Sequence, residues 1–326
     1  TGFKSASGEL NQSSQSYIYM AIRRGPLAVP EDATKVFAID FDDGATAPAY
    51  VSGFVTDMGI QTNTAGYNKR ISTRLTSGKY LETDNTGAEQ ASTSNYTWDF
   101  MNGWNNQSVG TTWFSWMWKR APGYFDVVCY DGQNNYGQEP HNLAVPPEIL
   151  ICKGREETSY GWSVIHTFAN SNNAGKLNSD VSFGSTYSAI SNFTSTHFPR
   201  AVDWSGQKNI AYLFASAPGV SKCGTYTGTG DASAQTIDCG FSSGAKMVII
   251  KCVSHNGQWY IFDVDRGITN TVNDGVLMLN NTTAQSPESS AFGASIDAIQ
   301  PDNSGFKVQY SDLNTSGRTF LFYAVA

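Results

Sequence analysis

The same stretch of sequence occurs near both ends of this chain. Residues 2–22 read GFKSASGELNQSSQSYIYMAI, residues 305–325 read GFKVQYSDLNTSGRTFLFYAV, and the two align without a gap. We therefore expect the chain to begin with the end of one repeated unit and to finish with the end of another. This repeat constrains the fold most, because each copy must form the same arrangement of secondary structure.

A recurring apolar run that ends in proline gives the length of the unit. Pro26, Pro122 and Pro218 follow such runs, and successive prolines are 96 residues apart. The spacing predicts that residues 1–24 are the C-terminal end of a preceding unit. It further predicts repeat 1 at 25–120, repeat 2 at 121–216 and repeat 3 at 217–326. Repeat 1 departs from the common pattern between residues 36 and 79, so its internal alignment is the weakest.

Other segments recur in the same order. Residues 147–153 resemble residues 245–251, and each segment precedes an expected strand that begins with a tryptophan, Trp162 or Trp259. Residues 81–86 resemble residues 277–282. A repeat of about 100 residues is too long for one propeller blade and is the usual size of a complete β-sandwich.

Short apolar runs separated by turn residues predict strands. Asn256-Gly257 lies between MVIIKCVS and QWYIFDV, which is a strong hairpin signal. We therefore expect an all-β chain of tandem β-sandwich domains, jelly-roll-like in topology, each of about 100 residues.

The run at 17–22 is apolar at every position, and alternate residues of a strand point to opposite faces. One face is expected to join the core of its own sandwich. The other face is expected to meet a neighbouring unit or the same strand in another chain. As an alternative, residues 1–22 pair back onto the last unit and close the array.

The composition excludes several classes of protein. Charged residues make up 15% of the 326 residues and aromatic residues 13%, which is unlike a disordered chain. The net charge of -7 argues against a nucleic-acid partner, because phosphate binding needs a basic surface. No apolar stretch reaches the roughly 18–20 residues of a membrane span. The five cysteines are widely spaced without a CxxC pair, so we expect buried free thiols, with one or more disulfides as the alternative.

The ordered motifs resemble a family of repeated β-domains from tail-fibre and other structural proteins of tailed bacteriophages. The motifs are GFK, LN and YIYMAIRR within residues 2–24, APG and YTGTG at 217–230, IDCGF at 237–241, VIIK at 248–251 and WYIF at 259–262. The resemblance covers nearly the whole chain. It implies a virion component, usually a fibre or appendage that faces the host, and it carries over no functional residues.

The sequence favours no catalytic site and no metal site. Glu156 and Glu157 are adjacent in an expected hairpin tip, whereas glycosidic carboxylates face each other across a groove. The acidic group in AIDFDDG at 38–44 lacks the ligand spacing of a calcium loop and is expected to form a polar turn. The four histidines lie in no metal-binding motif. We therefore expect no catalytic residues, no metal site and no cofactor.

Three tryptophans are the candidate ligand-binding residues. Trp98, Trp104 and Trp204 precede or lie between expected strands, where an exposed indole face could stack on a sugar. The other five tryptophans fall in expected core strands.

These observations lead to one functional expectation. The chain is expected to be a non-enzymatic bacteriophage virion protein, a tail fibre or similar external appendage that takes part in host attachment. The expected partners are other virion proteins, two further copies of the chain in a homotrimer, and a host-surface glycan. The alternatives are a capsid-decorating or head-fibre protein, a polysaccharide-degrading tailspike enzyme, and a carbohydrate-binding module outside a virus.

Overall fold

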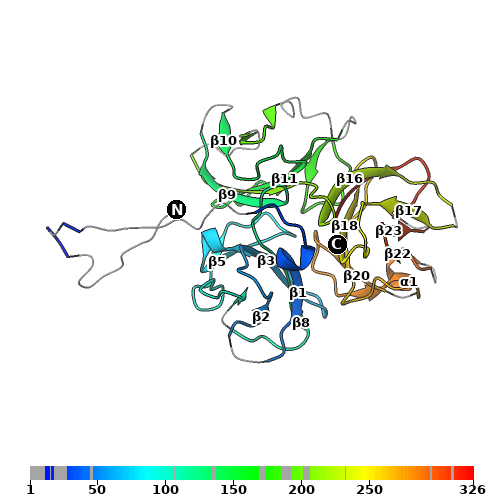
Figure 1. The fold of residues 1–326 in the computed structure, drawn as a ribbon, viewed down its shortest axis with the longest axis horizontal. Coiled ribbons are helices and arrows are strands. Elements are labelled where there is room, and N and C mark those ends of the chain that lie inside the picture. The colour runs from blue at the N-terminus through cyan, green and yellow to red at the C-terminus, as the bar shows by residue number, and fades with distance from the viewer. Residues whose placement is uncertain are drawn as a thin grey trace.

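Three lobes of antiparallel β-structure surround one centre (Figure 1). The computed structural model describes residues 12–14, 16–17, 28–44, 47–105, 107–133, 137–168, 173–184, 192–200, 206–231, 233–272, 274–293, 296–309 and 312–326. We call the lobes lobe 1 (37–118), lobe 2 (125–214) and lobe 3 (221–325). Each lobe has one large sheet and one smaller sheet, and each lies within one of the three predicted units. The expected all-β, sandwich-like fold is confirmed.

In lobe 1, a 3-10 turn, η2 (Ala33–Lys35), precedes the first strand, and η3 (Arg74–Thr76) follows the fourth. The large sheet has the order β1 (Phe37–Phe41), β8 (Trp113–Trp118), β3 (Met58–Asn63), β4 (Arg70–Thr73), β5 (Lys79–Glu82), β6 (Gln90–Ala91). The small sheet pairs β2 (Tyr50–Val51) with β7 (Gly103–Trp104).

In lobe 2, the large sheet has the order β13 (Ala174–Lys176), β12 (Ser163–His166), β11 (Ile149–Gly154), β15 (Lys208–Phe214), β9 (Phe125–Asp131). The small sheet pairs β10 (Gln138–Pro140) with β14 (His197–Pro199).

In lobe 3, the large sheet has the order β16 (Ser221–Thr227), β24 (Thr319–Val325), β18 (Met247–Cys252), β19 (Trp259–Asp263), β20 (Gly275–Met278), β21 (Ser286–Pro287). The small sheet has the order β17 (Gln235–Asp238), β23 (Gly305–Val308), β22 (Ile299–Asp302), and the helix α1 (Glu288–Ala291) follows β21. No helix within these described residues has the length and apolar character needed to cross a membrane.

The three lobes share one topology. In each, the first strand of the large sheet pairs with the last, and the last pairs with the third strand of the lobe. The strand register confirms the aligned segments: Leu81 pairs with Ile71 in lobe 1, as Leu277 pairs with Ile261 in lobe 3. The predicted hairpin around Asn256-Gly257 is also confirmed, because β18 pairs with β19.

The turn that begins a lobe differs between lobe 1 and the other two. Pro122 and Pro218 occupy the second position of equivalent turns, followed by Gly123 and Gly219 with φ of 71° and 72°. A proline followed by a positive-φ glycine is the signature of a type II turn. In lobe 1 the equivalent turn is η2, whose Ala33 precedes Ala121 by 88 residues rather than 96. The 96-residue spacing of the prolines therefore does not extend to the start of lobe 1, and Pro26 lies outside the described residues.

The last strand of each lobe contributes to two cores. In β24, Leu321, Tyr323 and Val325 belong to a central core shared by all three lobes, whereas the alternate residues Phe320 and Phe322 pack inside lobe 3. The same alternation occurs in β15 and β8. The expectation of one face in its own sandwich and the other against a neighbouring unit is confirmed for these strands. The partial unit at residues 1–24, including the run at 17–22, lies largely outside the described residues.

Two tryptophans join neighbouring lobes by equivalent contacts. Trp162 of lobe 2 donates its indole N–H to the Glu82 carbonyl of lobe 1 at 2.9 Å. Trp259 of lobe 3 donates in the same way to the Lys176 carbonyl of lobe 2 at 2.9 Å. By strand register, the residue that corresponds to Trp162 and Trp259 in lobe 1 is Lys69.

Lys69 closes the ring of lobes. Its side chain is fully buried, and its ammonium donates to the carbonyl of Asn281 in lobe 3 at 2.8 Å and to that of Tyr67 at 3.1 Å. Lys153 and Lys251 are the buried lysines of the other two junctions. Their ammonium groups also donate to main-chain carbonyls, and in each case one carbonyl lies across the junction: that of Thr86 for Lys153 and that of Asp180 for Lys251. Each junction between lobes therefore contains a buried lysine held by carbonyl oxygens.

These lysines predict a pH dependence of stability. Burial lowers the pKa of Lys69, Lys153 and Lys251 to about 8, against about 10.4 in an unfolded chain. Between these pH values the folded chain binds fewer protons than the unfolded chain, so the contribution of each lysine to the free energy of unfolding rises with pH. Replacing Lys69 with methionine should therefore make the slope of that free energy less positive, by up to about 1.4 kcal/mol per pH unit between about pH 8 and 10.

Urea unfolding at several pH values measures this slope. Lys208→Met is the matched control, because the Lys208 side chain is 60% exposed in its ion pair with Glu156. The control should keep the slope of the unchanged chain. Equal slopes for Lys69→Met and the unchanged chain would contradict the prediction.

Candidate functional site

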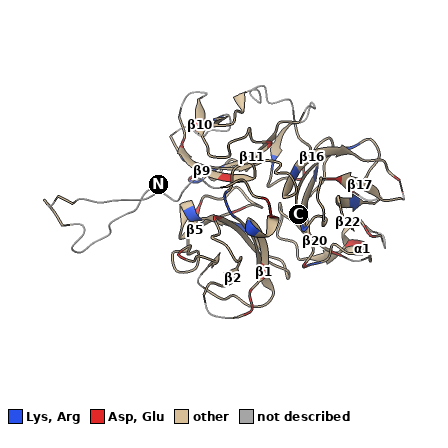
Figure 2. Ribbon diagram, viewed as in Figure 1, with Lys and Arg blue, Asp and Glu red and all other residues tan. Residues whose placement is uncertain are grey.

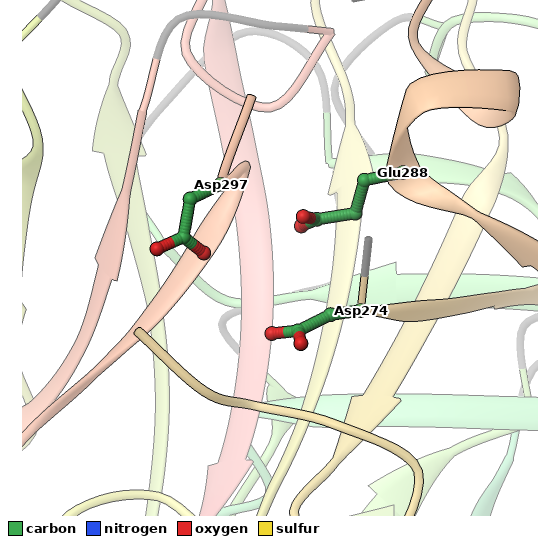
Figure 3. Close-up of side chains that lie close together, drawn as sticks. All are labelled: Asp274, Glu288 and Asp297. Atoms are coloured by element: carbon green, nitrogen blue, oxygen red, sulfur yellow. The ribbon is translucent and has the colours of Figure 1, made fainter. Parts of the chain in front are cut away.

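Three carboxylates from separate segments converge in lobe 3 (Figure 3). Asp274 immediately precedes β20, Glu288 is the first residue of α1, and Asp297 lies two residues before β22. One oxygen atom from each carboxylate lies within 4.8 Å of the other two. Asp274 and Glu288 flank strands of the large sheet, whereas Asp297 leads into the small sheet, so the cluster lies where the two sheets of the lobe meet.

Backbone and hydroxyl donors orient two of the carboxylates. The Oε1 atom of Glu288 accepts from the backbone amides of Ala298 at 2.9 Å and Ile299 at 3.1 Å. Asp274 accepts from Thr269 through its backbone amide at 2.8 Å and its hydroxyl at 2.7 Å. The second oxygen of Glu288, Oε2, and the Oδ1 atom of Asp297 are buried without a hydrogen-bond partner.

Burial and mutual repulsion make the cluster harder to ionise. Burial, opposed in part by the amide of Ile299 and reinforced by the two aspartates, raises the pKa of Glu288 to about 7. Burial and the nearby Asp274 raise the pKa of Asp297 to about 6. Burial also raises the pKa of Asp274, although its hydrogen bonds to Thr269 act in the opposite direction. Chemically, such a cluster can share protons or offer oxygen ligands to a hard cation.

Two of the three tryptophans predicted to bind a sugar have no exposed ring face. Trp98 and Trp104 are 1% and 0% exposed, and their rings stack on each other at 4.7 Å between centroids. The expectation of an exposed indole face is therefore wrong for both residues, because their side chains pack in a core between the large and small sheets of lobe 1. Trp204 lies outside the described residues.

The expected polar turn in the AIDFDDG segment forms at Asp42, whereas Asp40 lies in strand β1. Asp42 accepts hydrogen bonds from the backbone amides of Gly44 and Gly110 at 2.9 Å each and from the hydroxyl of Ser108. Asp40 accepts from the amide of Val51 at 2.7 Å. These bonds connect β1 and the residues that follow it to β2 and to the loop that contains Ser108 and Gly110.

The cysteines are free thiols, as expected, and no disulfide links them. Four are buried and Cys129 is half-buried. Burial raises the pKa of Cys223 and raises that of Cys239 to about 12, so neither is activated as a nucleophile.

Sequence reasoning missed the three carboxylates. Asp274 belongs to an Asp-Gly turn signal, but Glu288 follows it by 14 residues and Asp297 follows Glu288 by 9. No metal motif has this spacing, and only the packing of two sheets brings the side chains together.

A family model described as a domain of unknown function, DUF7483, matches residues 55–326. The chain belongs to the DUF7483 family. The match to DUF7483 spans parts of all three lobes and includes the junction residues Lys69, Trp162 and Trp259. It also includes all three carboxylates of the cluster. No curated protein matches the chain.

Proposed function

We propose that this chain is a non-enzymatic structural protein of a bacteriophage virion, a tail fibre or similar appendage that takes part in host attachment. The observation that supports the proposal best is the closed arrangement of three equivalent lobes within one chain. Their apolar faces share a central core, and the small sheets β2–β7, β10–β14 and β17–β23–β22 lie toward the outside (Figure 1). Such an arrangement gives a rigid body that presents three related surfaces.

Repetition suits attachment to a surface with many identical groups. When several weak sites act together, the second binding event becomes intramolecular, and the overall affinity exceeds that of each site. A host-surface glycan offers such repeated groups, and we propose it as the ligand class. Lys and Arg residues are distributed over all three lobes (Figure 2), which together with the net charge of -7 favours a polar neutral ligand over nucleic acid.

The contacts between lobes limit which surfaces remain for the proposed homotrimer. The apolar faces that suggested contacts between chains meet neighbouring lobes of the same chain instead. A homotrimer remains part of the proposal, with the outer surfaces of the lobes as its interface, because the central core already fills the inner faces.

Localisation on the particle tests the proposal. Antibodies against the purified chain would be used for immunogold electron microscopy of the phage particles whose genome encodes it. Gold at the tail or its fibres is the expected result. Gold over the head would instead establish the capsid-decorating alternative, and particles without gold would overturn a virion role.

A cell-binding assay tests the attachment step. The purified chain should bind host cells and compete with adsorption of the phage. Release of reducing ends from host polysaccharide by the purified chain would overturn the non-enzymatic assignment and favour the tailspike alternative.

A further inference from the structure

We propose that Asp274, Glu288 and Asp297 bind a single Ca²⁺ ion that links the two sheets of lobe 3. This cation site goes beyond the proposed function and does not depend on it. Figure 3 shows the three carboxyl groups directed toward a common space between their segments.

The three carboxylates offer oxygen atoms at a spacing that suits a calcium ion. Ca²⁺ takes oxygen ligands at about 2.3–2.6 Å. Two oxygens that share a calcium ion are therefore at most about 5 Å apart. The three carboxylate oxygens of the cluster satisfy this condition, since all lie within 4.8 Å of one another. Waters and nearby carbonyls would complete the shell of six to eight ligands that calcium prefers.

Glu288 has a buried carboxylate oxygen without a hydrogen-bond partner. Glu288 is 0% exposed, and its Oε1 atom is fixed by two backbone amides. Its Oε2 atom is buried without a hydrogen bond, and so is the Oδ1 atom of Asp297. A buried carboxylate oxygen that lacks a donor is costly, and a cation between the carboxylates supplies the missing interaction.

The three carboxylates have no cationic side chain paired with them among the described residues. Arg266 lies near this region, but its guanidinium pairs with the carboxylate of Asp263. No ion pair found among the described residues involves Asp274, Glu288 or Asp297. When the three carboxylates are ionised, their mutual repulsion opposes the contact between the two sheets. A divalent cation reverses the effect, so calcium should stabilise the junction of β20, α1 and β22.

Calcium titration of the full chain after chelator treatment tests the proposal. Isothermal titration calorimetry with CaCl₂ should give saturable binding at one site, and the thermal unfolding midpoint should rise with calcium until the site is full. Mg²⁺ should bind more weakly, because it demands octahedral geometry and gives up its waters reluctantly.

Two variants assign the binding to the cluster. Glu288→Gln and Asp297→Asn each remove a ligand charge with little change in shape, and each should weaken calcium binding by at least about tenfold. Asp231→Asn is the matched control, because Asp231 is an exposed carboxylate in a loop of the same lobe. It should bind calcium as the unchanged chain does. Far-UV circular dichroism confirms that each variant is folded, and two cluster variants keep the test decisive if one is not.

Three outcomes would overturn the proposal. The first is the absence of both a saturable heat and a shift in the unfolding midpoint for the unchanged chain. The second is calcium binding of unchanged affinity in both cluster variants. The third is an equal loss of affinity in Asp231→Asn, which would indicate a general charge effect.

Discussion

Replacing Arg266 with methionine should lower the free energy of unfolding by about 3–5 kcal/mol. Arg266 and Asp263 form an ion pair of 2.7 Å whose side chains are 1% and 0% exposed. The Asp263 carboxylate also accepts the indole N–H of Trp116 from lobe 1 at 2.8 Å. The guanidinium lies 5.2 Å from the ring centres of Phe114 and Trp116. The variant would leave a buried carboxylate without its counter-ion at the junction of lobes 1 and 3.

Urea unfolding of matched variants measures the effect. In the double variant Asp263→Leu with Arg266→Met, the uncompensated charge is gone, although the indole N–H of Trp116 and the backbone amide of residue 266 lose the carboxylate to which they donate. The double variant should therefore cost less than Arg266→Met, about 1–3 kcal/mol. Lys208→Met, which breaks an exposed ion pair, should cost no more than about 1 kcal/mol. If Arg266→Met matched this control, the ion pair would not hold the junction.

The repeat was predictable from the sequence because strands with equivalent environments keep equivalent side chains. Trp162 and Trp259 donate the same hydrogen bond across the same kind of junction, so both positions favour tryptophan. Lys153 and Lys251 align for the same reason. The continuous apolar runs also predicted strands with two buried faces, because opposite faces of one strand pack in different cores.

Lys69 shows why the closure of the ring could not be predicted. It takes the position of Trp162 and Trp259 but has no chemical likeness to tryptophan, and its partner Asn281 is more than 200 residues away in the chain. A lone lysine in a sequence indicates an exposed side chain, since lysine is rarely buried. Only the register of β4 identifies its equivalence.

The sequence did not predict the candidate site, for a related reason. Asp274 and Asp297 lie in loops and Glu288 begins α1, and their contact depends on the packing of one sheet on another. For Trp98 and Trp104 the sequence predicted a binding role, although both side chains are buried. Aromatic residues between expected strands resemble exposed loop residues, whereas Trp104 belongs to β7 and its side chain packs between the small and large sheets.

Replacing Trp259 with alanine should lower the free energy of unfolding by about 3–5 kcal/mol. Trp259 is 3% exposed, packs at 5.9 Å from the ring of Phe183 in lobe 2, and donates to the Lys176 carbonyl. The alanine variant loses this packing, leaves a cavity in the central core, and removes the donor for that carbonyl. Trp162→Ala should have an effect of the same size, because Trp162 makes the equivalent contact between lobes 2 and 1.

Further variants separate packing from hydrogen bonding at this junction. Trp259→Phe keeps an aromatic ring but leaves the Lys176 carbonyl without its donor, so it should cost about 1–3 kcal/mol. Met101→Ala is the control, since Met101 is 74% exposed, and it should change stability by no more than about 0.5 kcal/mol. Because the central core draws residues from all three lobes, urea should unfold the unchanged chain in one cooperative transition. Separate transitions, with only one of them shifted by Trp259→Ala, would mean that the lobes fold independently and that the indole does not couple them.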